Sequence, residues 1–487
     1  MKKLLFFVFT GFLSIQTLFA ADSLRLSQSQ TLQYAILVNN YFMQKHSDVG
    51  ANSYVGGTTR NSRIWTRGVY YEGLMSFYRQ YPQPECLKYT VDWGNFHKWI
   101  STSGSGQARH ADYQCCGQTY LDLYMMDPTA TVRKTHIKGI IDAMVSGTKI
   151  DDWYWIDAIQ MAMPIFAQLG TIEKNNAYFE RMYQMYMFTR DKHGGSTRGG
   201  GLPLFNTVDG FWYRDSDYDP PYADKIEKTK PCYWSRGCGW VYVALARVLY
   251  YSPNDVAHRE QYISDFKIMS EAYRSSQRAD GFWNVSLAAP SNTGHANSPG
   301  PETTGTALAI AGMAYGINTG ILDSTYLPCV IRAWNALCET AVHPDGFLGY
   351  VQGTGAKPED SQPVTYTTVP NFEDFGTGCF LLAAAEMYAL GNIDLTTSVK
   401  TPKGQNAISE FNCVEINKTL HIGFNAGERT DVDIELFDIN GRKITNINFR
   451  NSFGKNTYQI NTNGLAGFYL CRLNSKNCIL TKKIILE

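Results

Sequence analysis

Four short segments of the chain combine carboxylate, basic and aromatic side chains in a way that suits chemistry on a polar substrate: residues 110–113, 153–164, 210–215 and 234–240. The most informative residue is Asp157, which follows Trp153, Trp155 and Ile156 at an otherwise apolar helix start. Burial among such side chains raises the pKa of a carboxyl group, which suits a general acid. The alternative is a helix-capping aspartate that accepts hydrogen bonds from backbone amides.

Asp112 is the second candidate carboxylate, and it follows the basic residues Arg109 and His110. Two carboxyl groups in one cleft, one of them protonated, are what glycoside hydrolysis requires. The simpler interpretation of Asp112 is a surface ion pair with the basic residues that precede it.

Arg214 and Arg236 are candidate ligands for an anionic substrate, because a planar guanidinium matches the geometry of a carboxylate. Structural ion pairs with a nearby aspartate are an equal alternative, and Asp215, Asp217 and Asp219 are available for them.

Aromatic residues are the one unusual feature of the composition: 31 Tyr, 25 Phe and 10 Trp make up 14% of the 487 residues. Flat rings stack on sugar faces, but they also fill large cores. Trp155, Trp234 and Trp240 are candidates for contact with a sugar, each with a core position as the alternative.

The charge balance excludes some classes of protein. The 44 basic and 44 acidic residues leave no basic footprint for nucleic acid or for a membrane surface. With 44% hydrophobic and 18% charged residues, the chain can bury a large core and is not disordered as a whole.

Residues 1–20 have the pattern of a secretory signal: Lys2 and Lys3, an apolar run over residues 4–19, and a small residue at Ala20. A membrane anchor is the alternative, but the run is short for a spanning helix, and no later apolar run reaches the roughly 18 residues that one needs. We therefore expect an exported protein that does not span a membrane.

The 11 cysteines are scattered and odd in number, so they do not resemble a disulfide framework, and none has a partner at zinc-site spacing. Most are expected to be buried as small hydrophobic residues, and no metal site is expected. Cys471 and Cys478 could close a late hairpin with a disulfide.

Between about residues 28 and 392, apolar residues recur at helical spacing and are separated by loops rich in Gly and Pro. The clearest helical periods cover residues 65–81, 155–169, 240–251, 306–317, 326–341 and 377–390. This number of helices is too large for a four-helix bundle. They favour a closed double layer of helix pairs, an α/α toroid, with function on the long loops at one end.

The C-terminal part differs in kind, because period-two alternation runs through residues 432–438 to Asn440-Gly441, a strong hairpin signal. Further strands are predicted over residues 443–449, 458–460, 467–473 and 479–486. We therefore expect a helical domain over residues 21–395, a linker over 396–412 and a small β-sandwich-like domain over 413–487.

The helical part resembles the unsaturated glucuronyl and rhamnogalacturonyl hydrolases of glycoside hydrolase family 105 and its relative, family 88. The resemblance is carried, in order along the chain, by residues 67–74, 155–164, 233–241, 301–307 and 345–358. It implies an all-α (α/α)6 barrel with no metal and no organic cofactor. It also matches Asp157 to the proton donor of the family, and Asp112 to its second active-site aspartate.

The same resemblance matches Trp234 and Arg236 to residues that line the sugar subsite, and places Arg214 where some members carry a histidine. The implied substrate is an oligosaccharide that a polysaccharide lyase has left with a 4,5-unsaturated uronic acid at its non-reducing end. Asp157 would protonate C4 of this enol ether and water would add at C5. A polysaccharide lyase, an ordinary glycosidase and a non-catalytic sugar-binding protein are the alternatives on the same toroid.

Family resemblance favours rhamnose next to the unsaturated residue, either in rhamnogalacturonan or in ulvan, whose rhamnose is 3-sulfated. Export favours the ulvan type. Lys225, Lys228 and Lys230 are candidates for a sulfate pocket, with a solvated charged loop as the alternative.

The tail resembles the C-terminal sorting domain of the type IX secretion system of Bacteroidetes-type bacteria, through residues 432–444, 464–470 and 483–487. Residues 413–418 lack the usual proline-containing strand. The resemblance implies the secretion machinery as a partner and a location outside the inner membrane, at the cell surface or beyond.

Overall fold

The computed structural model describes residues 24–395 and 408–486, apart from residues 56–57, 196–199, 220–230, 232, 288–299, 356–359, 362–363, 368–372, 417, 439–441 and 476–477. The contacts divide the chain into two compact units, with the division between Thr397 and Ser398. The signal predicted over residues 1–20 and most of the predicted linker lie outside the described residues and stay predictions.

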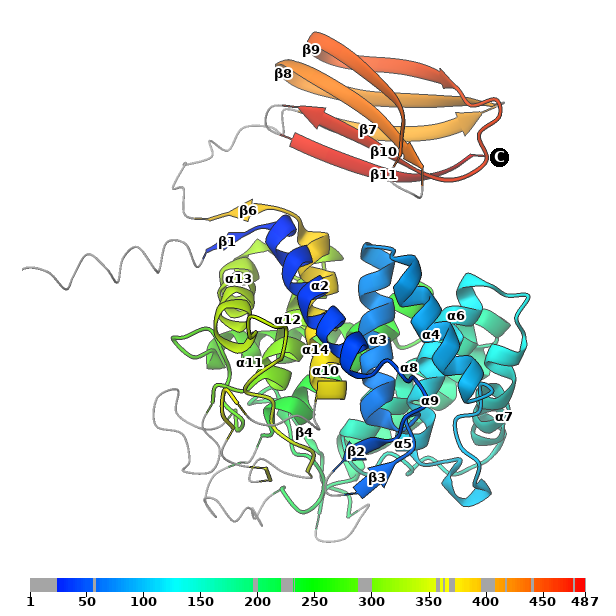
Figure 1. Cartoon of the computed structure of the whole chain (residues 1–487), viewed down its shortest axis with the longest axis vertical. Coiled ribbons are helices and arrows are strands. Elements are labelled where there is room, and N and C mark those ends of the chain that lie inside the picture. The colour runs from blue at the N-terminus through cyan, green and yellow to red at the C-terminus, as the bar shows by residue number, and fades with distance from the viewer. Residues whose placement is uncertain are drawn as a thin grey trace, which may run out of the picture. The chain divides into compact units, whose positions relative to one another are not determined.

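Six inner helices form a closed ring in the first unit (Figure 1). In chain order they are α3 (Trp65–Gln80), α6 (Cys116–Met126), α8 (Asp157–Glu173), α10 (Ser235–Tyr251), α12 (Thr303–Asn318) and α14 (Glu373–Leu390). Each contacts the next, and α14 returns to α3. Such helices are buried on nearly every side, and α8 is buried without a break from Asp157 to Gly170.

Outer helices alternate with the inner ones along the chain: α2 (Gln28–Lys45), α4 (Pro84–Phe96), α7 (Val132–Ser146), α9 (Asn176–Lys192), α11 (Arg259–Ser276) and α13 (Leu327–Ala336). Each packs on an inner helix and keeps a polar face toward water. In α7, for example, only Ile137, Ile141 and Met144 are buried. This arrangement is the predicted (α/α)6 barrel.

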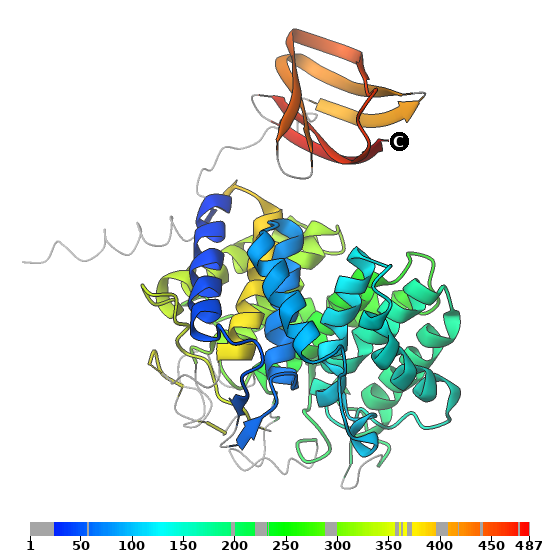
Figure 2. The same cartoon turned by 45° about the vertical axis from the view of Figure 1, so that its right-hand side comes forward.

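The inner helices run parallel, because each outer helix returns the chain to the end where the next inner helix begins. Their N-termini therefore gather at one end of the toroid. The hairpin of β2 (Ser53–Val55) and β3 (Thr58–Arg60) lies at this end, whereas β1 (Arg25–Leu26) pairs with β6 (Ile393–Asp394) at the other (Figures 1 and 2). Helix N-termini carry partial positive charge, so this end favours anionic groups.

Closure of the ring depends on a close approach of two backbones. A Cβ added to Gly73 of α3 would lie 2.2 Å from the carbonyl oxygen of Gly378 in α14, and one added to Gly378 would lie 2.3 Å from that of Val69. Backbone atoms cannot move aside as a flexible side chain can, so the contact between α3 and α14 requires glycine on both helices.

Gly73→Ala is expected to lower the free energy of unfolding by about 2 kcal/mol or more, because the added methyl group overpacks this contact. Denaturant unfolding of the purified protein measures the change. Gly139→Ala in α7 is the matched control, since nothing lies within 4 Å of its added Cβ. There the same change should be neutral or stabilising by up to about 1 kcal/mol. Equal effects at the two positions would contradict the role given to the α3–α14 contact.

The second unit is a five-stranded antiparallel sheet built on two long strands, β8 (Thr419–Asp438) and β9 (Lys443–Asn461). β7 (Ile408–Ile416) pairs with the first half of β8, β10 (Gly467–Ser475) pairs with its second half, and β11 (Cys478–Leu486) follows β10. Register shifts along β8 let the sheet curve over one apolar core. The small β-rich unit predicted for the tail is therefore confirmed, as one curved sheet, and its first strand begins at Ile408, within the stretch predicted as linker.

The strands correct two predictions in this unit. β9 is one continuous strand where two were predicted, over residues 443–449 and 458–460, because β8 offers it a partner along its whole length. The predicted Cys471–Cys478 disulfide is wrong: Cys471 is a free thiol opposite Lys482, and Cys478 pairs with Ser475. The Cys471 thiol instead forms a hydrogen bond with the thiol of Cys413, which lowers the pKa of Cys413.

The cysteines of the helical unit for which the structure gives a state are free and buried, as expected: Cys86, Cys115, Cys116, Cys238, Cys329, Cys338 and Cys379. Within the described part of the chain, no helix is long and apolar enough to cross a membrane.

Candidate active site

A cavity of about 500 Å³ lies at the end of the toroid where the inner helices begin. Its lining combines two carboxyl groups, two guanidinium groups and several rings: Arg60, Trp65, His110, Asp112, Tyr154, Trp155, Asp157, Met161, Arg214, Thr354 and Gly355. A cavity of this size and polarity suits a small, charged oligosaccharide. The structure thus brings together four residues predicted from three separate segments, namely Asp112, Asp157, Arg214 and Trp155.

Asp157 is the first residue of α8, and its side chain is only 8% exposed. The residue at the N-cap position is Ile156, which makes no capping hydrogen bond, so Asp157 is not the capping aspartate that the sequence left open. No described donor forms a hydrogen bond with its Oδ2 atom, and Nε of Arg214 lies 3.6 Å from it. Burial raises the pKa of Asp157, against the opposing charges of Arg214 and Arg236.

Asp112 lies in the short helix α5 (Ala111–Gln114), where its backbone N–H donates to Nδ1 of His110 at 3.3 Å. Arg109 is not its partner, because that guanidinium pairs with Asp152. Burial raises the pKa of Asp112 and the charge of Asp157 raises it further, against His110 and two arginines. A half-buried carboxyl group whose ionisation is opposed by a second, buried carboxyl group favours a state in which one of the two holds a proton.

Arg214 is fixed beside Asp157 through its backbone. Its carbonyl oxygen accepts a hydrogen bond of 3.0 Å from the amide of Ile156, immediately before α8. The guanidinium forms an ion pair with Asp215 and remains 20% exposed toward the cavity. It can therefore still receive an anionic group of a substrate.

Aromatic rings form a further part of the wall. The Trp155 ring lies 4.9 Å from that of His110 and 4.5 Å from that of Tyr154, measured between centroids. Trp65 contacts Trp240 edge to face at 6.4 Å. Trp240 itself is 1% exposed and supports Trp65 from behind.

Trp234 and Arg236 lie outside the lining, buried behind the cavity. The two terminal nitrogens of Arg236 donate to the carbonyl oxygens of Gln352 and Gly353, at 2.7 and 2.8 Å. Nε1 of Trp234 donates to the side chain of Gln352 at 2.8 Å. Both residues thus hold the segment that carries Thr354 into the cavity wall.

Several lining residues were not among the candidates predicted from the sequence: Arg60, Trp65, Tyr154, Thr354 and Gly355. Arg60 comes from the β2–β3 hairpin, where its backbone pairs with that of Ser53, and its guanidinium lines the cavity with no hydrogen bond or ion pair to another described side chain. No local pattern marks it, since the fold alone brings this hairpin to Asp112. Among the described residues, no three His, Cys, Asp or Glu side chains gather as a metal site would require.

Fold and cavity together define a carbohydrate-active enzyme of the toroid class, and comparison with known proteins agrees. The model of Glycosyl Hydrolase Family 88 matches residues 34–390, so the chain belongs to this family, and the resemblance found in the sequence is confirmed. A secretion system C-terminal sorting domain matches residues 416–487, which confirms the expectation of export by type IX secretion to the cell surface or beyond.

An unsaturated 3S-rhamnoglycuronyl hydrolase of Formosa agariphila is 30% identical over 345 residues, which cover 67% of this chain and 84% of that protein. A solved glycosyl hydrolase of family 88 from Bacteroides vulgatus is 32% identical at a TM-score of 0.65, over 74% of this chain and 99% of that one. A structure described as a polysaccharide lyase is 31% identical at a TM-score of 0.64. The match covers 74% of this chain and 97% of that one. The prediction of a glycoside hydrolase is confirmed by the family match.

The two candidate arginines are expected to respond differently to alanine. Arg236→Ala should lower the free energy of unfolding by about 3 kcal/mol, because it removes two buried charge-assisted hydrogen bonds. Arg214→Ala should raise KM at least about tenfold with a smaller loss of stability, because the cavity loses a cation that can bind substrate. Steady-state kinetics and denaturant unfolding of both variants measure this. A raised KM without lost stability in Arg236→Ala would instead place Arg236 on the substrate.

Proposed function

We propose that the enzyme removes the 4,5-unsaturated uronic acid from the non-reducing end of lyase-generated oligosaccharides in which the next sugar is a 3-sulfated rhamnose. The observation that carries this proposal is the pair Asp112 and Asp157: both carboxyl groups have a raised pKa and share one cavity with Arg214. The name of the Formosa agariphila relative supports both the unsaturated residue and the sulfated neighbour.

Asp157 is the proton donor in this proposal. Its Oδ2 atom has no hydrogen-bond donor among the described residues, and its raised pKa keeps the acid form present at higher pH than for an exposed aspartate. The proton goes to C4 of the C4=C5 double bond, and positive charge develops at C5 and the ring oxygen. Arg214 is placed to pair with the substrate carboxylate on C5, which fixes the double bond beside the acid.

Water then bonds to C5 and gives its proton to the Asp157 carboxylate, so that the acid is restored. The resulting hemiketal opens by breaking the bond between C5 and the ring oxygen, which leaves a ketone at C5 and a hemiacetal at C1. Collapse of that hemiacetal releases the neighbouring sugar as an alcohol. One carboxyl group serves both steps, so the spacing rule for retaining and inverting glycosidases does not apply. Asp112 lies in the same cavity and is ionised while Asp157 carries the proton.

Arg60 is the second cation of the lining, and it lies close enough to Asp112 to lower the pKa of that residue. A uronate linked to a sulfated rhamnose carries two anionic groups, and the described lining offers two arginines. We assign Arg214 to the carboxylate and Arg60 to the sulfate. The three lysines considered for a sulfate pocket, Lys225, Lys228 and Lys230, lie outside the described residues.

Asp157→Asn is expected to reduce turnover of an unsaturated disaccharide by about a thousandfold or more, because the amide cannot donate the proton. The loss of absorbance of the double bond measures turnover, and Asp112→Asn should also be strongly impaired. Asp92→Asn, an exposed ion-paired residue of α4, is the control and should behave as wild type. Substantial turnover by Asp157→Asn would remove its role as the acid.

The same assay separates the other candidate functions. A rise in absorbance from intact polysaccharide would identify a lyase, the activity by which one similar structure is described. A fall in absorbance with lyase-generated oligosaccharides identifies the hydrolase. Sugar binding with no change in absorbance would identify a binding protein.

Arg60→Gln is expected to abolish a preference of about tenfold or more for the sulfated over the unsulfated disaccharide, with turnover of the unsulfated one retained. Ratios of kcat/KM for the matched pair measure this preference. Arg63→Gln is the control: Arg63 lies outside the cavity lining and donates to Ser103 at 2.7 Å. An equal loss on both disaccharides would contradict the assignment of Arg60 to the sulfate.

A further inference from the structure

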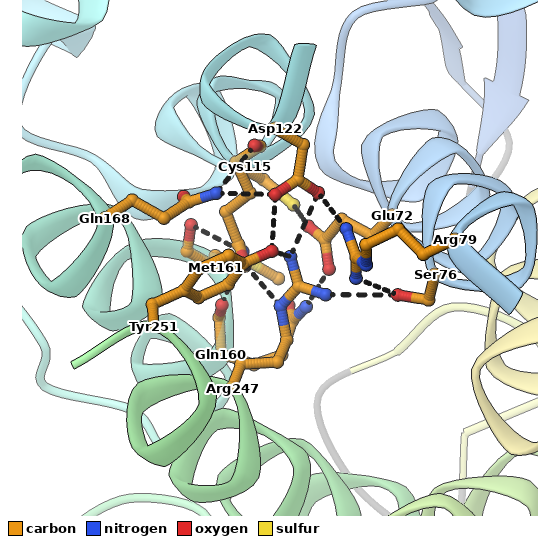
Figure 3. A network of polar contacts seen from close by, with 11 residues as sticks. Glu72, Ser76, Arg79, Cys115, Asp122, Gln160, Met161, Gln168, Arg247 and Tyr251 are labelled. Carbon is orange, nitrogen blue, oxygen red and sulfur yellow. Dashed lines mark hydrogen bonds and ion pairs between the residues drawn. The ribbon is translucent and has the colours of Figure 1, made fainter. Parts of the chain in front are cut away.

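A network of buried polar side chains lies in the interior of the inner ring (Figure 3). One part of it is an ionic cluster in which Asp122 accepts hydrogen bonds from Arg79 and Gln168, at 3.2 and 2.9 Å, and from Tyr251. Arg247 joins this cluster to α6 through a hydrogen bond of 2.9 Å to Gln118. These groups bind one another within the core, and the reaction proposed above does not use them.

Glu72 of α3 occupies a different place in this network (Figure 3). It is fully buried, and its two carboxyl oxygens have different partners. Oε1 accepts from the Cys115 thiol at 3.2 Å, and Oε2 accepts from Nε2 of Gln160 at 2.6 Å. One carboxylate therefore joins two other elements of the toroid.

Those two elements are the ones that carry the candidate catalytic carboxyl groups. Cys115 is the C-cap residue that directly follows the short helix α5, three residues after Asp112. Gln160 lies on α8, three residues or nearly one turn after Asp157. A shift of about 1 Å between catalytic groups can reduce a rate a hundredfold, so whatever fixes α5 against α8 controls the reaction.

We propose that Glu72 is a positioning residue, which sets the separation of Asp112 and Asp157 by joining Cys115 to Gln160. The inference rests on the proposed catalytic roles of the two aspartates. Glu72 itself is absent from the cavity lining, so it acts through its two partners and not on the substrate.

The bridge is complete only when Glu72 is ionised, because a protonated carboxyl group loses an acceptor site. Burial raises the pKa of Glu72 to about 7, against the lowering effect of Arg247 and of its own hydrogen bonds. The groups that face it are Arg247 of α10, Asp122 and Cys116 of α6, Cys115, Cys379 of α14, and the uncharged Gln160 of α8. Ionisation of Glu72 as pH rises through about 7 should therefore increase kcat.

Glu72→Gln tests this proposal in the full-length protein with the unsaturated disaccharide. The amide keeps the size of the side chain but can accept only through one oxygen. We expect kcat to fall at least about tenfold with KM nearly unchanged, and the rise of kcat near pH 7 to disappear. A merely structural role for Glu72 would leave that pH dependence in place.

Glu386→Gln is the matched control, because Glu386 is another glutamate of the inner ring with a pKa raised by burial. It lines a small cavity with the C-terminal halves of α3, α10 and α12, away from the helix starts where Asp112 and Asp157 lie. Its kcat and pH profile should match wild type. An equal loss in both variants, or an unchanged kcat in Glu72→Gln, would overturn the proposal. An inactive wild-type protein would instead overturn the proposed function.

Cys115 provides a second test that does not alter Glu72, in case Glu72→Gln fails to fold. Cys115→Ser retains a donor for Oε1 and should keep most of the kcat, whereas Cys115→Ala removes the donor and should lower kcat several-fold. Equal activity of the two Cys115 variants would contradict the bridge. Thermal unfolding of each variant shows whether a lost rate merely follows lost stability.

Discussion

Closure of the inner ring is the constraint on which the rest of the structure depends. A helix in this ring has no face toward water along most of its length, so each polar side chain needs a partner from a neighbouring helix. Asp122 shows the consequence, because it is held by Arg79 of α3, Gln168 of α8 and Tyr251 of α10. Such contacts fix the rotation and the height of each inner helix, which hydrophobic packing alone does not specify.

The same exclusion of water raises the pKa of the two proposed catalytic carboxyl groups where the ring ends. Asp157 and Asp112 lie at the end of the toroid where the inner helices begin. Burial still raises the pKa of a carboxyl group there, but no preceding turn of helix provides hydrogen-bond donors for all of its oxygens. Core carboxylates such as Glu72 are paired on both oxygens, whereas Asp157 lines the cavity and its Oδ2 atom has no hydrogen bond to a described residue. This difference distinguishes carboxyl groups that hold the fold from the carboxyl group proposed as the proton donor.

The sequence predicts the inner helices better than the outer ones. The periods over residues 155–169 and 240–251 mark α8 and α10, since helices buried on all sides are apolar throughout, whereas α9 and α11 show only narrow apolar stripes among charged residues. Asp157 was identifiable from its aromatic neighbours. Arg60 was not, because a hairpin distant in sequence brings it to the cavity. The Cys471–Cys478 prediction was wrong because the pairing register of β10 and β11 likewise depends on tertiary contacts.

Arg236 shows that a family motif does not by itself distinguish a residue that binds the substrate from a residue that holds the cavity wall in place. Sequence places Arg236 at the start of α10, but it does not say which side of that first turn faces the cavity. In the fold, Arg236 donates to the backbone carbonyl of Gln352. The backbone N–H of Gln352 donates to the Glu302 carboxylate at 3.2 Å. Glu302 in turn caps α12 through the amides of Thr304 and Gly305. Hydrogen bonds thus join the cavity wall to the first turns of inner helices, as the hydrogen bond between Ile156 and Arg214 joins Arg214 to the start of α8. The closed ring that excludes water therefore also fixes the positions of the loops.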